Sequence, residues 1–381
     1  MNNLDQIFVS LKQAILGAAG AFLPDWAVIL VSIFVSITAF AILGPVTMMY
    51  LTLLERKVVG RMQNRPGPNR VGKWGLLQPL ADGVKMLTKE DIVPFQADPV
   101  LHFLAPALIV MPALLVFAVI PFGRNMTGVD LNVGLLFFIA VSSTTTIAIF
   151  IASWGSHNKF SLLGGMRSAA QMISYEVPMV LAAVPAILAA GSLSTNSIVE
   201  AQHSLWFVFT PWGFVAFMMF FLCGVAECNR SPFDLPEGES EIVAGFHTEY
   251  SGMKFALFYM AEFMNSFTVA ALTATLFLGG WEGPLLPSWA WLFLKTYALI
   301  FVMIWFRGTL PRVRVDQLMG LAWKFLLPLA LVNIFVSALC HYLNPVTAFF
   351  ISAGILAFTF FILTKLNKGY VPEKRIYTFA D

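Results

Sequence analysis

Nine long apolar stretches follow one another along this chain, and they limit its fold more than any other feature. Each reaches the length of about 20 residues that a helix needs to cross the hydrocarbon core of a bilayer. In lipid a backbone must satisfy its own N–H and C=O groups, and a continuous apolar helix does so. The sequence therefore predicts an all-α integral membrane protein of about nine transmembrane helices. The predicted spans are Trp26–Leu54, Leu101–Phe122, Leu131–Ser153, Ala169–Gly191, Trp206–Val225, Phe255–Gly280, Trp289–Phe306, Phe325–Tyr342 and Pro345–Leu363.

Composition also indicates that lipid is the solvent. Of the 381 residues, 58% are apolar and 12% are charged, which leaves too little polar surface to coat a soluble globule of this size. The basic residues are scattered among loops and do not form a stripe that would bind nucleic acid. Cys223, Cys228 and Cys340 have neither zinc nor haem spacing. We expect the cysteines to act as small apolar side chains.

Lysine and arginine are distributed unevenly among the connections. They cluster after the first, third, fifth, seventh and ninth spans, and the other side has only Lys12, Arg124 and Lys295. Because basic residues favour the cytoplasmic side, the pattern predicts an outer N-terminus, a cytoplasmic C-terminus and an odd number of spans. Segment 1–25 lacks the positive start of a cleaved signal, and we expect it to lie at the membrane surface.

The spans and the charges together give a domain order. We expect spans within 26–54, 101–226, 255–306 and 325–363, and cytoplasmic segments at 55–100, 227–254, 307–324 and 364–381. The first two of these segments hold most of the charged residues, and function concentrates where a rigid scaffold presents such loops.

The first long loop combines basic residues with an amphipathic stretch. Its arginines suit lipid phosphates, neighbouring carboxylates or a polar head-group, and membrane anchoring alone is the plainer interpretation. Between positions 76 and 90 the residues Leu76, Leu80, Val84 and Leu87 follow helical spacing. This spacing predicts a short interfacial helix, on which Asp82 and Lys85 would form the lip of a lipid-facing portal or simply pack at the surface.

Two glutamates fall inside predicted spans. Glu176 lies in the fourth span and Glu262 about two turns into the sixth. An ionised carboxylate in hydrocarbon is costly unless it is paired, hydrated or protonated, so both residues are functional candidates facing the bundle interior. The alternative is that each is a neutral glutamate that links helices by hydrogen bonds.

The loop at 227–254 is the most informative segment. It holds six carboxylates and one arginine, interleaved with apolar residues, which suggests that it folds back against the protein. Glu227, Glu241, Glu249 and Glu262 form a series of titratable groups leading into the sixth span, as a proton relay requires. His247 and the oxygen ligands raise the alternative of a metal, but no histidine or cysteine pair accompanies them, so no metal site is predicted.

These loops resemble the H-subunit family of respiratory complex I, the proton-translocating NADH:quinone oxidoreductase. The resemblance covers nearly the whole chain, and its long polar motifs occur in order between apolar spans. The motifs are Glu55-Arg-Lys, Gly60-Arg-Met-Gln-Asn-Arg65, Gly67-Pro-Asn-Arg70, Gln78-Pro-Leu-Ala-Asp-Gly83, Ser174-Tyr-Glu-Val177, Pro232-Phe-Asp-Leu-Pro-Glu237, Gly245-Phe-His-Thr-Glu-Tyr-Ser-Gly-Met253 and Arg307-Gly-Thr-Leu-Pro-Arg-Val-Arg-Val-Asp316.

The resemblance implies a role in a translocase. The first and fifth inner loops would form a quinone chamber beside the peripheral arm, with Arg56, Gly83 and Lys85 along its passage and Asp82 beside them. The residues matching the family's proton-relay glutamates are Glu176, Glu227, Glu241, Glu249 and Glu262. One departure is that the third span has Ser142-Ser-Thr-Thr-Thr146 where some members carry a further acidic residue.

The resemblance also implies partners and a location. Quinone would be the substrate, whereas NADH, FMN and iron–sulfur clusters would lie on other subunits, because this chain has no cluster or dinucleotide motif. Its partners would be the quinone-site subunits of the peripheral arm, small neighbouring membrane subunits and lipid. The extra C-terminal span and its basic tail favour a bacterial inner membrane by family analogy.

Three other functions remain open at this level. The chain could be the equivalent component of a membrane-bound hydrogenase or of a ferredoxin-linked or F420-linked dehydrogenase. A stand-alone secondary transporter would need a midplane substrate site and preferably internal repeats, which the sequence does not show. A structural anchor for the peripheral arm would use the same loops as protein interface and the glutamates as links between helices.

Overall fold

The computed structural model describes residues 5–236, 238 and 242–366, and the regular structure in these ranges is helical. The predicted tail at 364–381 falls mostly outside them. The helices are α2 (Ile7–Gly20), α3 (Asp25–Met62), α4 (Gln78–Thr88), α5 (Pro99–Leu115), α6 (Gly134–Gly155), α7 (Lys159–Ala190), α8 (Thr195–Ala201), α9 (Pro211–Glu227), α11 (Gly252–Phe277), α12 (Ser288–Thr309), α13 (Val315–Gly320), α14 (Leu327–Cys340) and α15 (Pro345–Leu366).

The predicted all-α membrane architecture is confirmed. Eight helical segments in the described ranges are long and apolar enough to cross a bilayer, and one of them joins α13 and α14 through the π-helix Leu321–Leu326. The fifth predicted span corresponds to α9, an apolar helix of 17 residues that follows the short 3-10 helix Phe207–Phe209. The amphipathic stretch of the first loop forms α4, and the predicted surface segment contains α2.

Two helices extend well beyond the predicted spans. Helix α3 continues past Leu54 to Met62, because most of the residues after Leu54 are good helix formers and the next proline is Pro66. Helix α7 begins at Lys159, where the side chain of Asn158 accepts a hydrogen bond from the N–H of Phe160 as an N-cap. Charged residues predicted in loops therefore lie on helices.

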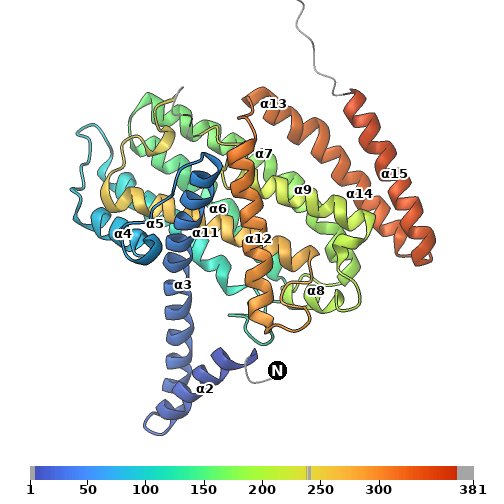
Figure 1. Ribbon diagram of the computed structural model, residues 1–381, viewed down its shortest axis with the longest axis horizontal. Helices are drawn as coiled ribbons and strands as arrows, with labels where there is room; N and C mark the ends of the chain where they lie inside the picture. Colours follow the sequence, from blue (N-terminus) through green and yellow to red (C-terminus); the bar gives the residue numbers. More distant parts are fainter. Residues whose placement is uncertain (1–4, 237, 239–241, 367–381) are drawn as a thin grey trace, which may run out of the picture.

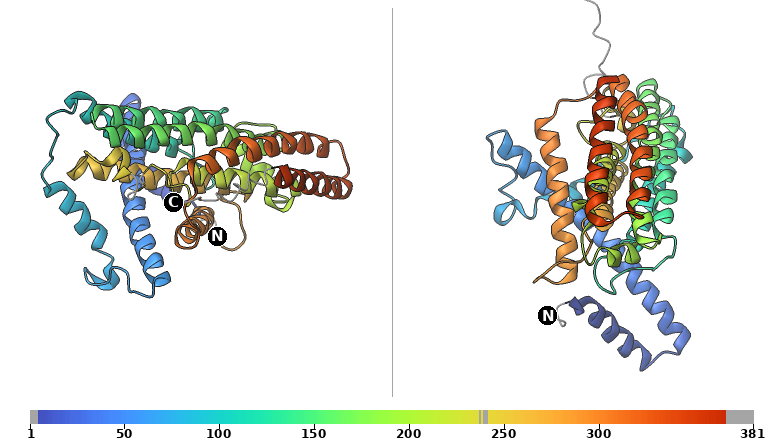
Figure 2. Two further views of the ribbon diagram at one scale, coloured as in Figure 1. Left: turned by 90° about the horizontal axis from the view of Figure 1, so that it is seen from above. Right: turned by 90° about the vertical axis from the view of Figure 1, so that its right-hand side faces the viewer.

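The helices form an elongated bundle with one projection. Figure 2 shows α4 and α5 at one end and α14 and α15 at the other. Helix α2 and the first half of α3 project from the bundle (Figure 1), and the Nζ of Lys12 joins them by donating to the Oγ of Ser36 at 2.8 Å. Exposed apolar side chains such as Ile33 and Phe34 give this projection a surface suited to lipid or to other membrane helices.

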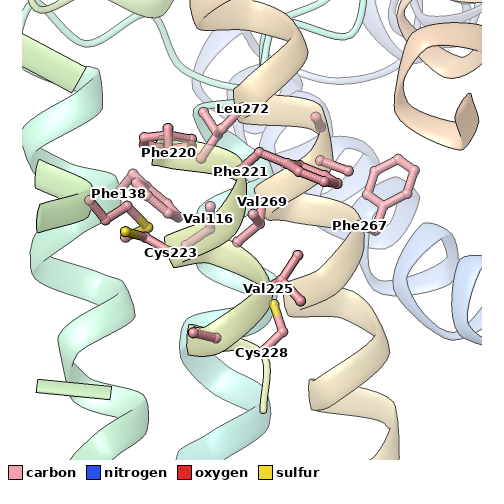
Figure 3. Close-up of a cluster of buried hydrophobic side chains, with 14 of the residues drawn as sticks. Val116, Phe138, Phe220, Phe221, Cys223, Val225, Cys228, Phe267, Val269 and Leu272 are labelled. Carbon is pink, nitrogen blue, oxygen red and sulfur yellow. The ribbon is translucent and has the colours of Figure 1, made fainter. Parts of the chain in front are cut away.

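Helix α11 is the centre of the bundle. Every residue from Ser266 to Phe277 is buried, and small residues such as Ala270 and Ala274 let neighbouring helices approach closely. Figure 3 shows Val269 and Leu272 of α11 beside Phe220 and Cys223 of α9. This tightly packed half of α11 fixes the position of its more polar first half, which carries Glu262.

Candidate functional site

A cavity of 1110 Å³ lies between the end of α3, the turn that follows it, and the helices α11 and α12. Its wall is largely polar and basic on the α3 side and aromatic on the α11 side. The lining residues are Thr52, Glu55, Arg56, Val59, Met62, Gln63, Arg65, Pro66, Gly67, Pro68, Asn69, Arg70, Gln78, Tyr259, Phe263, Arg307 and Gly308.

Glycine at position 67 lets the turn fold tightly back onto α3. A Cβ on Gly67 would lie 2.8 Å from the Cα of Lys57 and 3.0 Å from the carbonyl oxygen of Arg56. The N–H of Arg65 donates to the carbonyl oxygen of Gly60 at 2.9 Å and closes the end of the helix. The turn is thus a fixed wall of the cavity.

Four charged side chains from four segments meet at the inner wall of the cavity. Arg230 Nη1 lies 2.6 Å from Glu55 Oε2, and Arg230 Nε lies 2.9 Å from Glu262 Oε1. Arg307 also donates to Glu55. The Arg230 guanidinium lies 4.1 Å from the centre of the Phe263 ring. Glu55 and Arg230 are only 6% and 7% exposed, so each charge depends on the others for compensation.

The electrostatics keep Arg230 charged. Burial alone would lower the pKa of its guanidinium, but the carboxylates of Glu262 and Glu55 outweigh that effect and raise the pKa above its ordinary value. Arg230 therefore acts as a permanent positive charge between two carboxylates.

The predicted portal residues separate into two groups. Arg56 lines the cavity and forms an ion pair of 2.6 Å with Asp82, which also accepts from Gln78 at 3.0 Å. Gly83 and Lys85 lie on the exposed side of α4 and do not line this cavity. A Cβ on Gly83 would meet nothing within 4 Å. The apolar side chains at helical spacing in this stretch are exposed: Leu76, which precedes α4, and Leu80, Val84 and Leu87 on it.

Two water-sized cavities lie deeper in the bundle, and Glu227 and Asn265 line both. The larger has a volume of 30 Å³ and is also lined by Glu262 and His247. The smaller, of 10 Å³, reaches Ser142 of α6. A volume of about 10–15 Å³ holds one water molecule when polar partners are present. Oε2 of Glu227 has no hydrogen-bond partner among the described protein atoms, so it offers such a water an acceptor.

The remaining predicted glutamates lie on either side of this region. Glu176 on α7 accepts a hydrogen bond from Ser143, and it is near enough to Glu227 to act on its charge. Glu249 accepts a hydrogen bond of 2.5 Å from Asn158 Nδ2 at the start of α7. Glu241 lies outside the described residues. The structure therefore brings Glu262, Glu227 and Glu176 into one series and places Glu249 in a separate cluster.

Sequence reasoning missed the buried ion cluster. It singled out the hydroxyl run Ser142-Ser-Thr-Thr-Thr146 but not the contact between Ser143 and Glu176. By hydropathy, Glu55 stands at the start of a loop and Arg307 in a basic connection, and neither position indicates a buried contact. One signal is present: Arg230 is the single arginine in a loop of six carboxylates, a pattern that predicts an ion pair. Three candidate metal ligands do not come together anywhere in the part of the chain that the structure describes.

Comparison with known proteins places the chain in a family. Residues 34–338 match the family described as NADH dehydrogenase. The chain is 52% identical over 298 residues to a NADH-quinone oxidoreductase H subunit of Geobacter sulfurreducens, covering 76% of this chain and 90% of the relative. Identity to the corresponding H subunit of Anoxybacillus flavithermus is 52% over 324 residues, covering 83% and 96%. With that of Dehalococcoides mccartyi it is 51% over 293 residues, covering 77% and 82%. The chain therefore belongs to the H-subunit family of NADH-quinone oxidoreductase, as its loop motifs predicted.

Proposed function

We propose that the 1110 Å³ cavity is this chain's share of a quinone chamber in the assembled oxidoreductase, and that the buried carboxylates couple quinone reduction to proton translocation. The observation that carries the proposal is that Glu55 belongs to both features. It lines the cavity, and it shares Arg230 with Glu262. Glu262 in turn lines a small cavity together with the inner carboxylate Glu227.

The cavity suits the two parts of a quinone. Its volume of 1110 Å³ slightly exceeds the range of about 300–1,000 Å³ that is typical of small-molecule sites, so a quinone head-group with part of its tail would fit. Arginine and amide side chains such as Arg56 and Gln63 supply hydrogen-bond donors for carbonyl oxygens, and Tyr259 and Phe263 supply a flat apolar wall. The exposed apolar side of α4 would lie in the membrane surface and give the isoprenoid tail a path from the lipid.

The carboxylate series supplies a physical route for coupling. Reduction of a quinone to a quinol takes two electrons and two protons, so charge and protonation change at the chamber wall. Such a change alters the balance of Glu55, Arg230 and Glu262, and through the shared small cavity it reaches Glu227. Glu176 is the next carboxylate, and Ser143 fixes its orientation. The hydroxyl groups of α6 would here serve where some family members have a carboxylate.

Electron delivery and proton pumping would take place on partner subunits. The electrons would come from NADH through FMN and iron–sulfur clusters on peripheral-arm subunits, and pumping would take place in neighbouring membrane subunits. The turn at 63–70 and the segment 228–251 would face the peripheral arm on the cytoplasmic side of a bacterial inner membrane, with the N-terminus outside. Asp82 would hold Arg56 at the chamber wall, and Lys85 and Gly83 would face lipid or partner along the passage.

Photo-crosslinking of a quinone analogue in native membranes tests the chamber. We expect label on peptides containing residues 56–70 or 259–263, lost when excess quinone competes. A label on this chain that quinone does not displace, or none in membranes with working NADH:quinone activity, would contradict the proposal.

A structural role is the second candidate, because the Glu55–Arg230–Arg307 cluster ties several segments together. A Glu262→Gln variant separates the two roles. An anchor would lose assembly, whereas a relay would lose coupled turnover in a complex that still assembles. An assembled Glu262→Gln complex with normal coupled turnover would contradict the relay.

A further inference from the structure

His102 is a buried histidine that the proposed relay does not include. It lies in the first turn of α5 and is 0% exposed. Its ring is stacked on the ring of Tyr250, with centroids 4.2 Å apart and planes 7° from parallel. Both of its nitrogens are close to polar atoms, so the side chain has one defined orientation.

The two nitrogen contacts define the protonation of His102. Lys254 Nζ lies 3.4 Å from Nδ1, and the carbonyl oxygen of Glu249 lies 3.4 Å from Nε2. An ammonium group can only donate and a carbonyl oxygen can only accept. The arrangement therefore favours a lone pair on Nδ1 and a proton on Nε2, which is a neutral imidazole.

We propose that neutral His102 is a positioning residue that holds the segment 245–251, with Glu249, in its working place. This inference rests on the proposed role of that segment in coupling. Besides Glu249, the segment carries His247, which lines the small cavity together with Glu227 and Glu262. Asn158 holds the Glu249 carboxylate from the other side, and the Tyr250 hydroxyl donates to the carbonyl oxygen of Ala152 at 3.4 Å.

His102 also links this segment to the connection that follows α4. Lys254, which contacts Nδ1, forms an ion pair of 2.8 Å with Asp91. Next to that pair, the N–H of Ile92 donates to Ser251 Oγ at 3.0 Å. Helix α4 is the proposed portal helix, and Asp91 lies in the connection that follows it. A displacement of this connection would therefore be transmitted to Glu249 through the contacts of Asp91 with Lys254, of Lys254 with His102, and of His102 with Glu249.

Protonation of His102 would break this link. A proton on Nδ1 would point an N–H group at the Lys254 ammonium, and two like charges would then face each other. The other groups facing the ring are Asp91, Glu249 and Tyr250. Burial raises the pKa of Tyr250 above its ordinary value, so Tyr250 stays neutral. Both contacts of the ring are at the long end of hydrogen-bond distances, so repulsion would separate them readily.

The test measures NADH-driven proton translocation with quinone as acceptor in sealed vesicles, between about pH 4.5 and 7.5. This range extends well below the ordinary imidazole pKa of about 6.5, because the Lys254 ammonium that faces Nδ1 opposes a second positive charge. Assembled complex is quantified by electron transfer from NADH to an artificial acceptor that bypasses quinone. We expect unmodified complex to lose coupled turnover several-fold toward acid pH. His102→Gln keeps a donor near Glu249 but cannot titrate, so its coupled turnover should remain flat across this range. His102→Phe keeps only the stacking on Tyr250. Its coupled turnover should be several-fold lower than that of the unmodified complex at neutral pH, and it should stay low at every pH.

His341→Gln, at an exposed histidine outside the cluster, is the matched control and should keep the unmodified profile. An acid loss in His102→Gln equal to that of the unmodified complex would overturn the inference, and so would normal turnover in His102→Phe. Glu249→Gln, measured in the same vesicles, separates failure of the His102 inference from failure of the proposed coupling role of segment 245–251. If Glu249→Gln is impaired and the His102 variants are normal, only the role of His102 fails. If Glu249→Gln is normal, the coupling role of the segment fails.

Discussion

At the residue scale, the inner wall of the cavity depends on charge compensation by Arg230. This guanidinium is the positive charge shared by Glu55 and Glu262, and both of its ion pairs are within 2.9 Å. A buried ion pair contributes little net stability compared with an apolar pair, but removal of one partner leaves a charge without compensation. Substitution of Arg230 therefore tests whether the buried ion cluster is needed to hold its segments together.

Replacement of Arg230 by methionine keeps the volume and removes the charge. We expect Arg230→Met to cost roughly 3–5 kcal/mol, because Glu262 would lose its ion pair with Arg230 and the buried Glu55 would keep only its ion pair with Arg307. The readout is the apparent unfolding temperature and the yield of assembled complex. Arg314→Met, at an exposed arginine, is the control. Equal stability of the two variants would show that the cluster is not needed to hold the segments together.

Ser143 allows a test of the inner end of the carboxylate series. Its hydroxyl donates to Glu176 and orients that carboxyl group, and a typical intramolecular hydrogen bond contributes about 0.5–1.5 kcal/mol. Ser143→Ala should therefore lower coupled turnover several-fold with assembly unchanged. Thr144→Ala removes a neighbouring exposed hydroxyl that bonds only within α6, and it should have no effect. Identical turnover in the two variants would remove Ser143 from the route.

At the element scale, the cavity depends on how α3 ends. The helix runs past the membrane span into the polar turn, and the turn packs back on the helix backbone at Gly67. One face of the extension carries Glu55 and Arg56 toward the cavity. The length of α3 thus determines which residues line the large cavity.

A single methyl group at the turn tests this dependence. Gly67→Ala would place a Cβ 2.8 Å from the Cα of Lys57, so the turn must move away from α3. We expect competable labelling by the quinone analogue, and NADH:quinone turnover, to fall several-fold. Gly354→Ala, in open space on α15, is the control and should retain both. If Gly67→Ala binds the analogue as well as the control does, the turn is not a wall of the chamber.

The apolar spans could be predicted because bilayer thickness fixes their length, and the family could be recognised from the loop motifs. The C-terminal end of α3 and the start of α7 could not be predicted, because hydropathy falls where a helix leaves the membrane even when the helix continues. The meeting of Glu55, Arg230 and Arg307 was also out of reach, because it depends on how α3, α12 and a long loop pack. Glu262 and Glu227 were found because a carboxylate beside or within an apolar span is conspicuous by itself.

At the scale of the whole molecule, charge and water-sized space run from one end of the bundle into its middle. The large cavity lies beside α4 and the end of α3, and the small cavities lie among α5, α6, α9 and α11. The apolar half of α11 closes the route on the far side, where every residue from Ser266 to Phe277 is buried. This arrangement supports the proposed coupling, which would begin at the large cavity and pass through the small cavities into the middle of the bundle.

Glu227 is the residue at which the route can be interrupted most cleanly, because it lines both small cavities and does not line the large one. Glu227→Gln keeps the shape and removes the titrating group. The decisive measurement is NADH-driven proton translocation by the assembled Glu227→Gln complex, normalised to electron transfer that bypasses quinone. We predict a loss of at least about tenfold, within the range that a positioned proton-transfer group contributes. The exposed variant Glu200→Gln should be unaffected. Normal proton translocation by assembled Glu227→Gln complex would contradict the carboxylate relay.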